Sequence, residues 1–283
     1  METGTLYVVA TPIGNLADIS RRAIDVLSQV DVIAAEDTRV TQKLLTALAI
    51  KTRLISVREH NEAREAERII AWLREGKSVA QVSDAGTPSV SDPGAVLVDV
   101  VRQAGLKVVP IPGANAAIAA LSASGFTQAQ FLIYGFLPPK SGQRKSALEA
   151  LREQVATLAF YEAPHRIVEC VDDLLTVFGP ERQIVLAREL TKTFEQIHRC
   201  SLADAPAWLA ADSNHQRGEF VLLVAGAPEA AAEEEIPAEA LRVLTILLAE
   251  LPVKQASSLA AEITGANRKK LYQAALDMRA DRD

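Results

Sequence analysis

An apolar run that ends in a sharp turn opens the chain, and it reads Leu6-Tyr7-Val8-Val9-Ala10-Thr11-Pro12-Ile13-Gly14-Asn15-Leu16. Its first five residues have the length and apolar content of a buried strand, and the turn residues Pro12 and Gly14 end that strand. Similar short apolar runs recur over the next hundred residues, and amphipathic segments of helical length separate them. This alternation is typical of a parallel sheet with helical crossovers, so the sequence predicts an α/β fold. The strands expected in this first lobe, residues 1–113, are 6–10, 32–35, 54–57, 79–83 and 108–111.

Helices are expected between these strands. One covers residues 64–75 and ends before Gly76. Another covers residues 93–104, with Asp92 as the N-cap and Pro93 at the first helical position, where its missing N–H costs nothing. A third helix, rich in small residues, is expected to end near Gly125.

A second α/β lobe is predicted over residues 114–228. Its strands do not alternate regularly with helices, which favours a mixed sheet over a wholly parallel one. The expected strands are 131–136, 158–161, 184–188, 194–199 and 220–225, and the expected helices are 146–153 and 166–178.

A third unit is predicted at the C-terminal end of the chain. Residues 229–237 are rich in Ala, Glu and Pro and have no apolar period, which indicates a linker. The unit itself, residues 238–283, contains three expected helices with helix-turn-helix spacing. These helices cover 238–251, 253–263 and 268–278.

Composition restricts the class of protein. The 283 residues are 49% hydrophobic and 23% charged, as in a soluble globular enzyme. No apolar run approaches the roughly 20 residues that span a bilayer, so we expect a cytoplasmic protein without membrane contact. Cys170 and Cys200 have no close spacing to each other or to the four histidines, which predicts neither a disulfide framework nor a metal site.

The net charge of −6 argues against an RNA-binding surface that is positive throughout, but it permits local basic patches. Lys140, Arg144 and Lys145 form one candidate patch, in what we expect to be a mobile loop that grips phosphates. A second patch is formed by Arg268, Lys269 and Lys270. Each patch has a structural alternative. The first would be an ordinary solvated loop, and the last helices would simply pack a small bundle through Leu259, Ile263, Leu271 and Ala275.

Candidate ligand-binding loops follow the expected strands at their carboxyl ends, where open α/β sheets place their ligands. Three are rich in Gly, Pro and small residues, and the fourth, Glu36-Asp37-Thr38-Arg39, is charged. The glycine motif of dinucleotide-binding folds and the P-loop motif are both absent from the sequence. The three small-residue loops are 11–16, 83–89 and 112–116.

Taken together, these segments resemble the ribosomal RNA small subunit methyltransferase I family of the tetrapyrrole methylase superfamily. The resemblance covers most of the chain and includes the segments 6–16, 35–39, 84–93, 135–138, 160–166 and 188–192. It implies two α/β lobes of the tetrapyrrole methylase type with a helical C-terminal unit, and S-adenosylmethionine held between the lobes. It also implies 2′-O-methylation of a cytidine in 16S ribosomal RNA, with that RNA or the small ribosomal subunit as partner, and a homodimer.

The cofactor would lie against small residues, because Ala and Gly let the backbone approach a ligand closely. The resemblance adds Tyr161 and Glu162 from the second lobe. The residues expected to bind S-adenosylmethionine are Pro12, Asp84, Ala85, Gly86, Thr87, Ser89, Pro112, Gly113, Ala116 and Ala117, together with Tyr161 and Glu162.

A general base would assist attack by a ribose hydroxyl. Asp37, Glu36 and Lys140 are candidates by residue type, and the sequence does not separate them. The alternative for Asp37 is a helix cap that forms an ion pair with its neighbours. His165 is expected to pack or cap a helix. The residues expected to contact RNA are Asn15, Arg39, Lys140, Arg144, Lys145, Arg268, Lys269 and Lys270.

Two other functions fit parts of the sequence. A tetrapyrrole or precorrin C-methyltransferase would share the fold, but it would need neither the C-terminal helices nor the basic segment near Lys145. A nucleic-acid-binding regulator that senses a small ligand would explain those features without catalysis.

Overall fold

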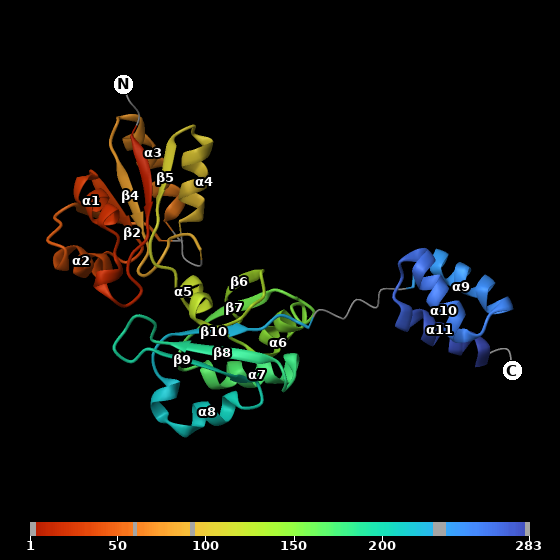
Figure 1. Cartoon of the computed structure of the whole chain (residues 1–283). Helices are drawn as coiled ribbons and strands as arrows, with labels where there is room; N and C mark the ends of the chain where they lie inside the picture. Colours follow the sequence, from red (N-terminus) through yellow and green to blue (C-terminus); the bar gives the residue numbers. More distant parts are fainter. Residues whose placement is uncertain (1–3, 59–60, 91–93, 229–235, 281–283) are drawn as a thin grey trace. The chain divides into compact units, whose positions relative to one another are not determined.

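The computed structural model describes residues 4–58, 61–90, 94–228 and 236–280. The chain divides into two compact units, residues 1–227 and 228–283 (Figure 1). The first unit contains two sheets, and the second is helical. The two-lobed α/β fold with a helical C-terminal unit is therefore confirmed, whereas the boundary expected after residue 113 stays a prediction. Most of the expected linker, residues 229–235, lies outside the described residues.

The first sheet contains five parallel strands in the order β3-β2-β4-β1-β5. All five were expected within one residue of where they lie. Because the strands are parallel, the loops that follow them meet at one edge of the sheet. The strands are β1 (Thr5–Val9), β2 (Val32–Ala35), β3 (Arg53–Ser56), β4 (Val79–Val82) and β5 (Lys107–Ile111).

Helices bury both faces of this sheet, which explains why its strands are mostly apolar. One face packs on α3 and α4 through a cluster that includes Leu6, Ile69 and Leu97. The other packs on α1 and α2 through Leu27 and Leu45. The helices are α1 (Arg21–Gln29), α2 (Thr38–Ala47), α3 (Glu62–Arg74) and α4 (Ala95–Gln103).

The start of α4 differs from the expectation. Its N-cap is Gly94, with a φ of 126°, and not Asp92, which lies with Pro93 outside the described residues. An added Cβ at position 94 would overlap the amide end of the Gln81 side chain. The backbone angle therefore favours glycine at this cap, and the contact with Gln81 adds to that preference.

The second sheet is mixed, as expected: β6 pairs with β7 in parallel, and the remaining pairs are antiparallel. Its order is β6-β7-β10-β8-β9. The strands are β6 (Phe131–Phe136), β7 (Thr157–Glu162), β8 (Gln183–Arg188), β9 (Gln196–Ser201) and β10 (Phe220–Val224).

Helices also lie on both faces of the second sheet (Figure 1). The larger core packs α6 (Ser141–Glu149), α7 (Ile167–Phe178) and α8 (Ala205–Ala211) against Phe160 and Leu222. The other face packs α5 (Ala116–Ala123) through small residues such as Ala117 and Ala120.

The segment around Arg144 differs from what the sequence predicted. We expected a mobile loop followed by a helix over 146–153, but α6 already begins at Ser141. The side chain of Arg144 is 0% exposed, and its Nε atom lies 2.6 Å from Oδ2 of Asp173 on α7. Lys145 lies 3.3 Å from the other oxygen of the same carboxylate. Arg144 therefore holds α6 to α7, and the prediction that it binds phosphate is wrong.

The third unit packs its three helices around Leu244, Leu271 and Ala275, which are fully buried. Leu259 and Ile263 are 40% and 63% exposed, so the expectation that they also pack the bundle is wrong. Gly265 ends the second helix in the left-handed conformation, and the Asn267 side chain accepts hydrogen bonds from the backbone at the start of the third. The helices are α9 (Ala238–Glu250), α10 (Val253–Thr264) and α11 (Arg268–Ala280).

Among the described residues, no helix combines the length and the apolar character that a membrane crossing requires.

The buried ion pair of Arg144 leads to a stability prediction. Burial acts to raise the pKa of Asp173, but hydrogen bonds from Arg144, Ser141 and Lys145 hold it below its ordinary value. Arg144→Met should leave this carboxylate buried without its main partner and lower the free energy of unfolding by about 3 kcal/mol at neutral pH. Urea denaturation measures the difference.

The pH dependence and a control complete this test. Since the folded-state pKa of Asp173 is lowered, its contribution is full above the ordinary carboxyl range and is lost as the pH falls. The difference between the two proteins should therefore shrink in acid. Lys77→Met, which breaks an exposed pair with Glu75, should change the stability by less than about 1 kcal/mol. A loss no larger in Arg144→Met than in Lys77→Met would contradict the assignment.

Candidate active site

Backbone hydrogen bonds join the loops that follow β1 and β4. Thr11 N donates to Gly86 O over 2.9 Å, and Gly86 N donates to Thr11 O over 3.0 Å. Gly86 has a φ of +81°, a conformation that favours glycine. The Thr87 hydroxyl donates to Ala114 O over 2.9 Å and so joins the loop that follows β5. The three small-residue loops of the sequence analysis thus meet at one edge of the first sheet.

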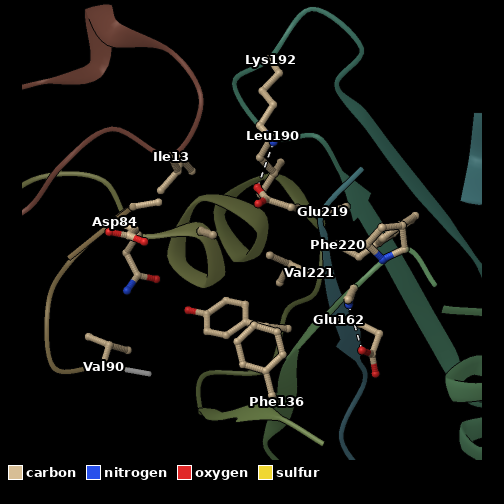
Figure 2. A pocket seen from close by; sticks show the side chains of 18 of the residues that line it. Ile13, Asp84, Val90, Phe136, Glu162, Leu190, Lys192, Glu219, Phe220 and Val221 are labelled. Carbon is tan, nitrogen blue, oxygen red and sulfur yellow. Dashed lines mark hydrogen bonds and ion pairs between the residues drawn. The ribbon is translucent and has the colours of Figure 1, made fainter. Parts of the chain in front are cut away.

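A cavity of about 610 Å³ lies beside these loops. The loop after β4 forms one wall with Asp84–Thr87 and Val90, and Ile13 adds to it from the loop after β1. Figure 2 shows Phe136, Val221 and Glu162, from strands of the second sheet, across the cavity from Asp84 and Val90. The start of α5 also contributes, through Asn115 and Ala116.

Seven of the twelve residues expected to bind the cofactor line this cavity. Their roles stay predictions, but the structure brings them together from the loop after β4, from the start of α5 and from β7. They are Asp84, Ala85, Gly86, Thr87, Ala116, Tyr161 and Glu162.

The other five expected residues are not among the described residues that line the cavity. For three of them the structure shows another role. Ala117 is fully buried in the core under α5. A Cβ on Gly113 would lie 2.8 Å from the Cβ of Ala10, so glycine permits the close approach of two loops there. The Ser89 hydroxyl accepts a hydrogen bond from Gln81. Pro12 and Pro112 lie within these loops but are not among the described residues that line the cavity.

The three candidates for a general base are now separated. Glu36 lines the cavity, whereas Asp37 and Lys140 are not among its described lining residues. Asp37 caps α2, and its carboxylate lies 2.6 Å from the Arg39 guanidinium. Hydrogen bonds from Arg39 hold the pKa of Asp37 well below its ordinary value. Asp37 is therefore a weak proton acceptor and shows the ion-paired helix cap that the sequence analysis gave as its alternative.

The expected RNA contacts differ in how accessible they are. Asn15 and Arg39 are exposed on the first lobe, although the Asn15 side chain also caps a short 3-10 helix, Leu16–Asp18. Lys140 is exposed at the N-cap of α6. Arg268 and Lys269 are exposed at the start of α11, and Lys270 beside them is half-buried.

Sequence reasoning missed the part of the wall formed by Lys192, Leu190 and Glu219. The Lys192 ammonium lies 2.8 Å from a Glu189 oxygen and 2.9 Å from a Glu219 oxygen. Burial acts to lower the pKa of Lys192, but these carboxylates raise it above its ordinary value. Lys192 is therefore charged at neutral pH and is not a proton acceptor.

Backbone strain marks the same segment, since Glu189 and Thr191 have φ values of 52° and 65°. Residues other than glycine adopt such angles mainly where the surroundings enforce them, often at functional sites. A Cβ at Gly14 would lie 2.5 Å from the Lys192 side chain, so this turn packs closely on the loop after β1. Residues 188–192 are one of the segments that resemble the methyltransferase family. This resemblance was the sequence signal that could have identified them as part of the site.

Comparisons with known proteins agree with this architecture. The family model of Tetrapyrrole (Corrin/Porphyrin) Methylases matches residues 5–206, and that of the RsmI C-terminal HTH domain matches residues 234–279. The solved structure of uroporphyrin-III-C-methyltransferase from Thermus thermophilus has a TM-score of 0.56 at 26% identity, covering 78% of this chain and 94% of that one.

Two curated relatives are similar over nearly their whole length. Ribosomal RNA small subunit methyltransferase I of Pseudomonas aeruginosa is 55% identical, covering 98% of each chain. The protein of the same name from Escherichia coli O157:H7 is 51% identical, covering 97% of this chain and 95% of that one. With its two α/β lobes, the cavity at their loops and the matching helical unit, this chain belongs to the ribosomal RNA small subunit methyltransferase I family of the tetrapyrrole methylases.

Proposed function

We propose that the protein transfers the methyl group of S-adenosylmethionine to the 2′-hydroxyl of a cytidine in 16S ribosomal RNA. The observation that carries this proposal is the similarity, over almost the whole chain, to ribosomal RNA small subunit methyltransferases I. The tetrapyrrole C-methyltransferase alternative is less favoured, because the solved structure of that class is 26% identical over a smaller part of the chain. The helical unit that matches the RsmI C-terminal domain also supports an RNA substrate.

The cavity suits S-adenosylmethionine in size and lining. Gly86 lines the cavity, and a Cβ there would already be in van der Waals contact with the Ile13 side chain at 3.4 Å and with Ala114 O at 3.6 Å. Residues 84–87 would hold the cofactor through backbone groups, and Ala116 at the start of α5 would leave helix N–H groups accessible to its carboxylate. When bound, the cofactor supplies an electrophilic methyl group on a sulfonium that leaves as a neutral thioether.

The chain's own contribution to the reaction is mainly orientation and exclusion of water. Apolar side chains of the second lobe, including Leu190 and Val221, line the cavity and limit solvent there. Positioning a ribose hydroxyl in line with the methyl group would account for much of the acceleration. Glu36 is the candidate that the geometry favours as proton acceptor, since it lines the cavity and Asp37 is held by Arg39.

The proposal includes the partners that the resemblance implies. The RNA, alone or within the small ribosomal subunit, would contact the exposed cations Arg39, Lys140, Arg268 and Lys269. A homodimer is also part of the proposal. It is supported by the edge strand β6, where the side chains of Phe131 and Leu132 are 51% and 39% exposed. Sedimentation at several protein concentrations tests the dimer.

The function is tested by mapping ribose methylation in 16S RNA. RNA from cells without this protein should lack 2′-O-methylation at one cytidine, and the purified protein with S-adenosylmethionine should restore it. A regulator that only senses a ligand would leave the RNA unmodified. An unchanged methylation map in the deletion strain would reject the proposed substrate.

Gly86→Val should obstruct the cofactor site, because Gly86 lines the cavity and the two methyl groups of valine would extend beyond a Cβ that already contacts Ile13 and Ala114. Calorimetry should show that the affinity for S-adenosylmethionine falls by about a hundredfold, the effect of losing about 2.7 kcal/mol of binding free energy. Gly105→Val is the matched control, since Gly105 has a similar φ of +72° but no atom within 4 Å of its added Cβ. Equal affinities of the two variants would rule out this role for Gly86.

The helical unit is expected to strengthen RNA binding. A chain ending near Ala232 should keep its cofactor site, because every lining residue precedes the cut, but it should bind RNA more weakly. Arg268→Glu with Lys269→Glu should mimic the truncation and flatten the salt dependence of binding, since fewer counterions are released. Arg279→Glu, at the other end of α11, is the control. If truncated and full-length proteins bind RNA equally at one salt concentration, the unit has another role.

A further inference from the structure

The turn that follows β6 depends on side-chain donors. It contains Pro138 and Pro139, which have no N–H groups, so the usual backbone hydrogen bonds of a turn are missing. Arg166 donates from Nη2 to Leu137 O over 2.7 Å and to Pro138 O over 3.2 Å. Arg144 donates to Pro139 O over 3.3 Å. Two arginines thus satisfy three successive carbonyl groups.

This turn directly follows an aromatic part of the cavity wall. Phe136, the last residue of β6, lines the cavity and packs against Tyr161 of β7 with ring centroids 5.6 Å apart. The Phe136 side chain is 57% exposed, so its neighbours hold it only partly in place. The backbone that follows it therefore has a large share in fixing the position of its ring.

Glu162 connects the same arginine to β7. Its side chain is 0% exposed, and its Oε1 atom accepts a hydrogen bond from Ala163 N and lies 3.2 Å from Arg166 Nε. Figure 2 shows its carboxylate directed away from Asp84 and Val90, which lie across the cavity. The carboxylate is thus oriented to hold Arg166 and not to contact a ligand. Burial, together with the nearby Glu162 carboxylate, raises the pKa of the Cys170 thiol, so the cysteine remains a neutral neighbour.

We propose that Arg166, held by Glu162, is a positioning residue for the cofactor site. Its guanidinium joins the end of β7 to the turn after β6, and so fixes the Phe136 and Tyr161 rings as one wall. The inference rests on the proposed function, because the wall is useful only if the cavity binds S-adenosylmethionine. Glu162 acts through Arg166, and its contact with the cavity comes from its backbone.

A purely structural arginine of the same lobe provides the comparison. Arg182 also donates to two backbone carbonyls, Ala225 O over 3.1 Å and Arg152 O over 3.0 Å. Arg182, Ala225 and Arg152 are not among the described residues that line the cavity. Arg166→Gln and Arg182→Gln each remove two such hydrogen bonds, so a general loss of stability should affect both variants.

The test combines melting temperature with calorimetric binding of S-adenosylhomocysteine. Arg166→Gln should raise the dissociation constant about tenfold, since a displaced wall weakens every contact made on it, whereas Arg182→Gln should change it less than about twofold. In methylation assays the KM for S-adenosylmethionine should rise more than kcat falls. Arg166→Lys, which keeps the charge beside Glu162, should recover part of the affinity.

The outcomes separate the inference from the proposed function. Equal dissociation constants for the two glutamine variants would show that Arg166 only stabilises the lobe and would overturn the inference. If the wild-type protein does not bind S-adenosylhomocysteine, the proposed function itself fails. Should Arg166→Gln not fold, because it leaves the buried Glu162 carboxylate without its cationic partner, the double variant with Glu162→Gln removes that charge. The double variant should show the same tenfold loss, and wild-type affinity there would equally overturn the inference.

Discussion

The paired backbone hydrogen bonds between Thr11 and Gly86 are the interaction on which the site depends. They extend the contact of β1 and β4 beyond the end of the sheet, so that two loops far apart in sequence behave as one surface. This pairing requires the left-handed backbone of Gly86, and the Thr87 hydroxyl then adds the loop before α5. The small residues of these loops are therefore constrained twice, since they must pair with each other and leave room for a ligand.

Much of the fold could be predicted because apolar periodicity reports burial directly. The strands of the first sheet are covered on both faces and are mostly apolar, so they were located within one residue. The start of α6 could not be predicted in this way. Its first turn contains Ser141, Gly142 and Gln143, which are poor signals for a helix, and its main anchor is a buried ion pair between Arg144 and Asp173. A charged residue in a polar segment resembles a surface residue until its partner is known.

The candidate site was predictable to a similar extent and for a similar reason. Loops of small residues after strands are visible in a sequence, and Asp84–Thr87 indeed lines the cavity. Residues such as Ala187 and Val221 line it from strands of the second sheet, and only the assembled sheet shows which face they occupy. Glu162 shows that even within a recognised motif the sequence does not predict the direction of a side chain. Its position beside the cavity was expected, but the direction of its carboxylate depends on Arg166 and on the backbone of Ala163.

The same contacts change how this acidic chain can approach RNA. Arg144 and Arg166 are used inside the second lobe, and Lys145 and Lys192 are paired with carboxylates. Positive charge that appears in the sequence as a basic segment is therefore largely neutralised within the protein. Attraction of a phosphate backbone falls off within about 10 Å at moderate salt, so only exposed cations contribute strongly. Of the residues expected to contact RNA, the exposed cations are Arg39, Lys140, Arg268 and Lys269. Two of these four cations lie at the start of α11, which supports the proposal that the helical unit strengthens RNA binding.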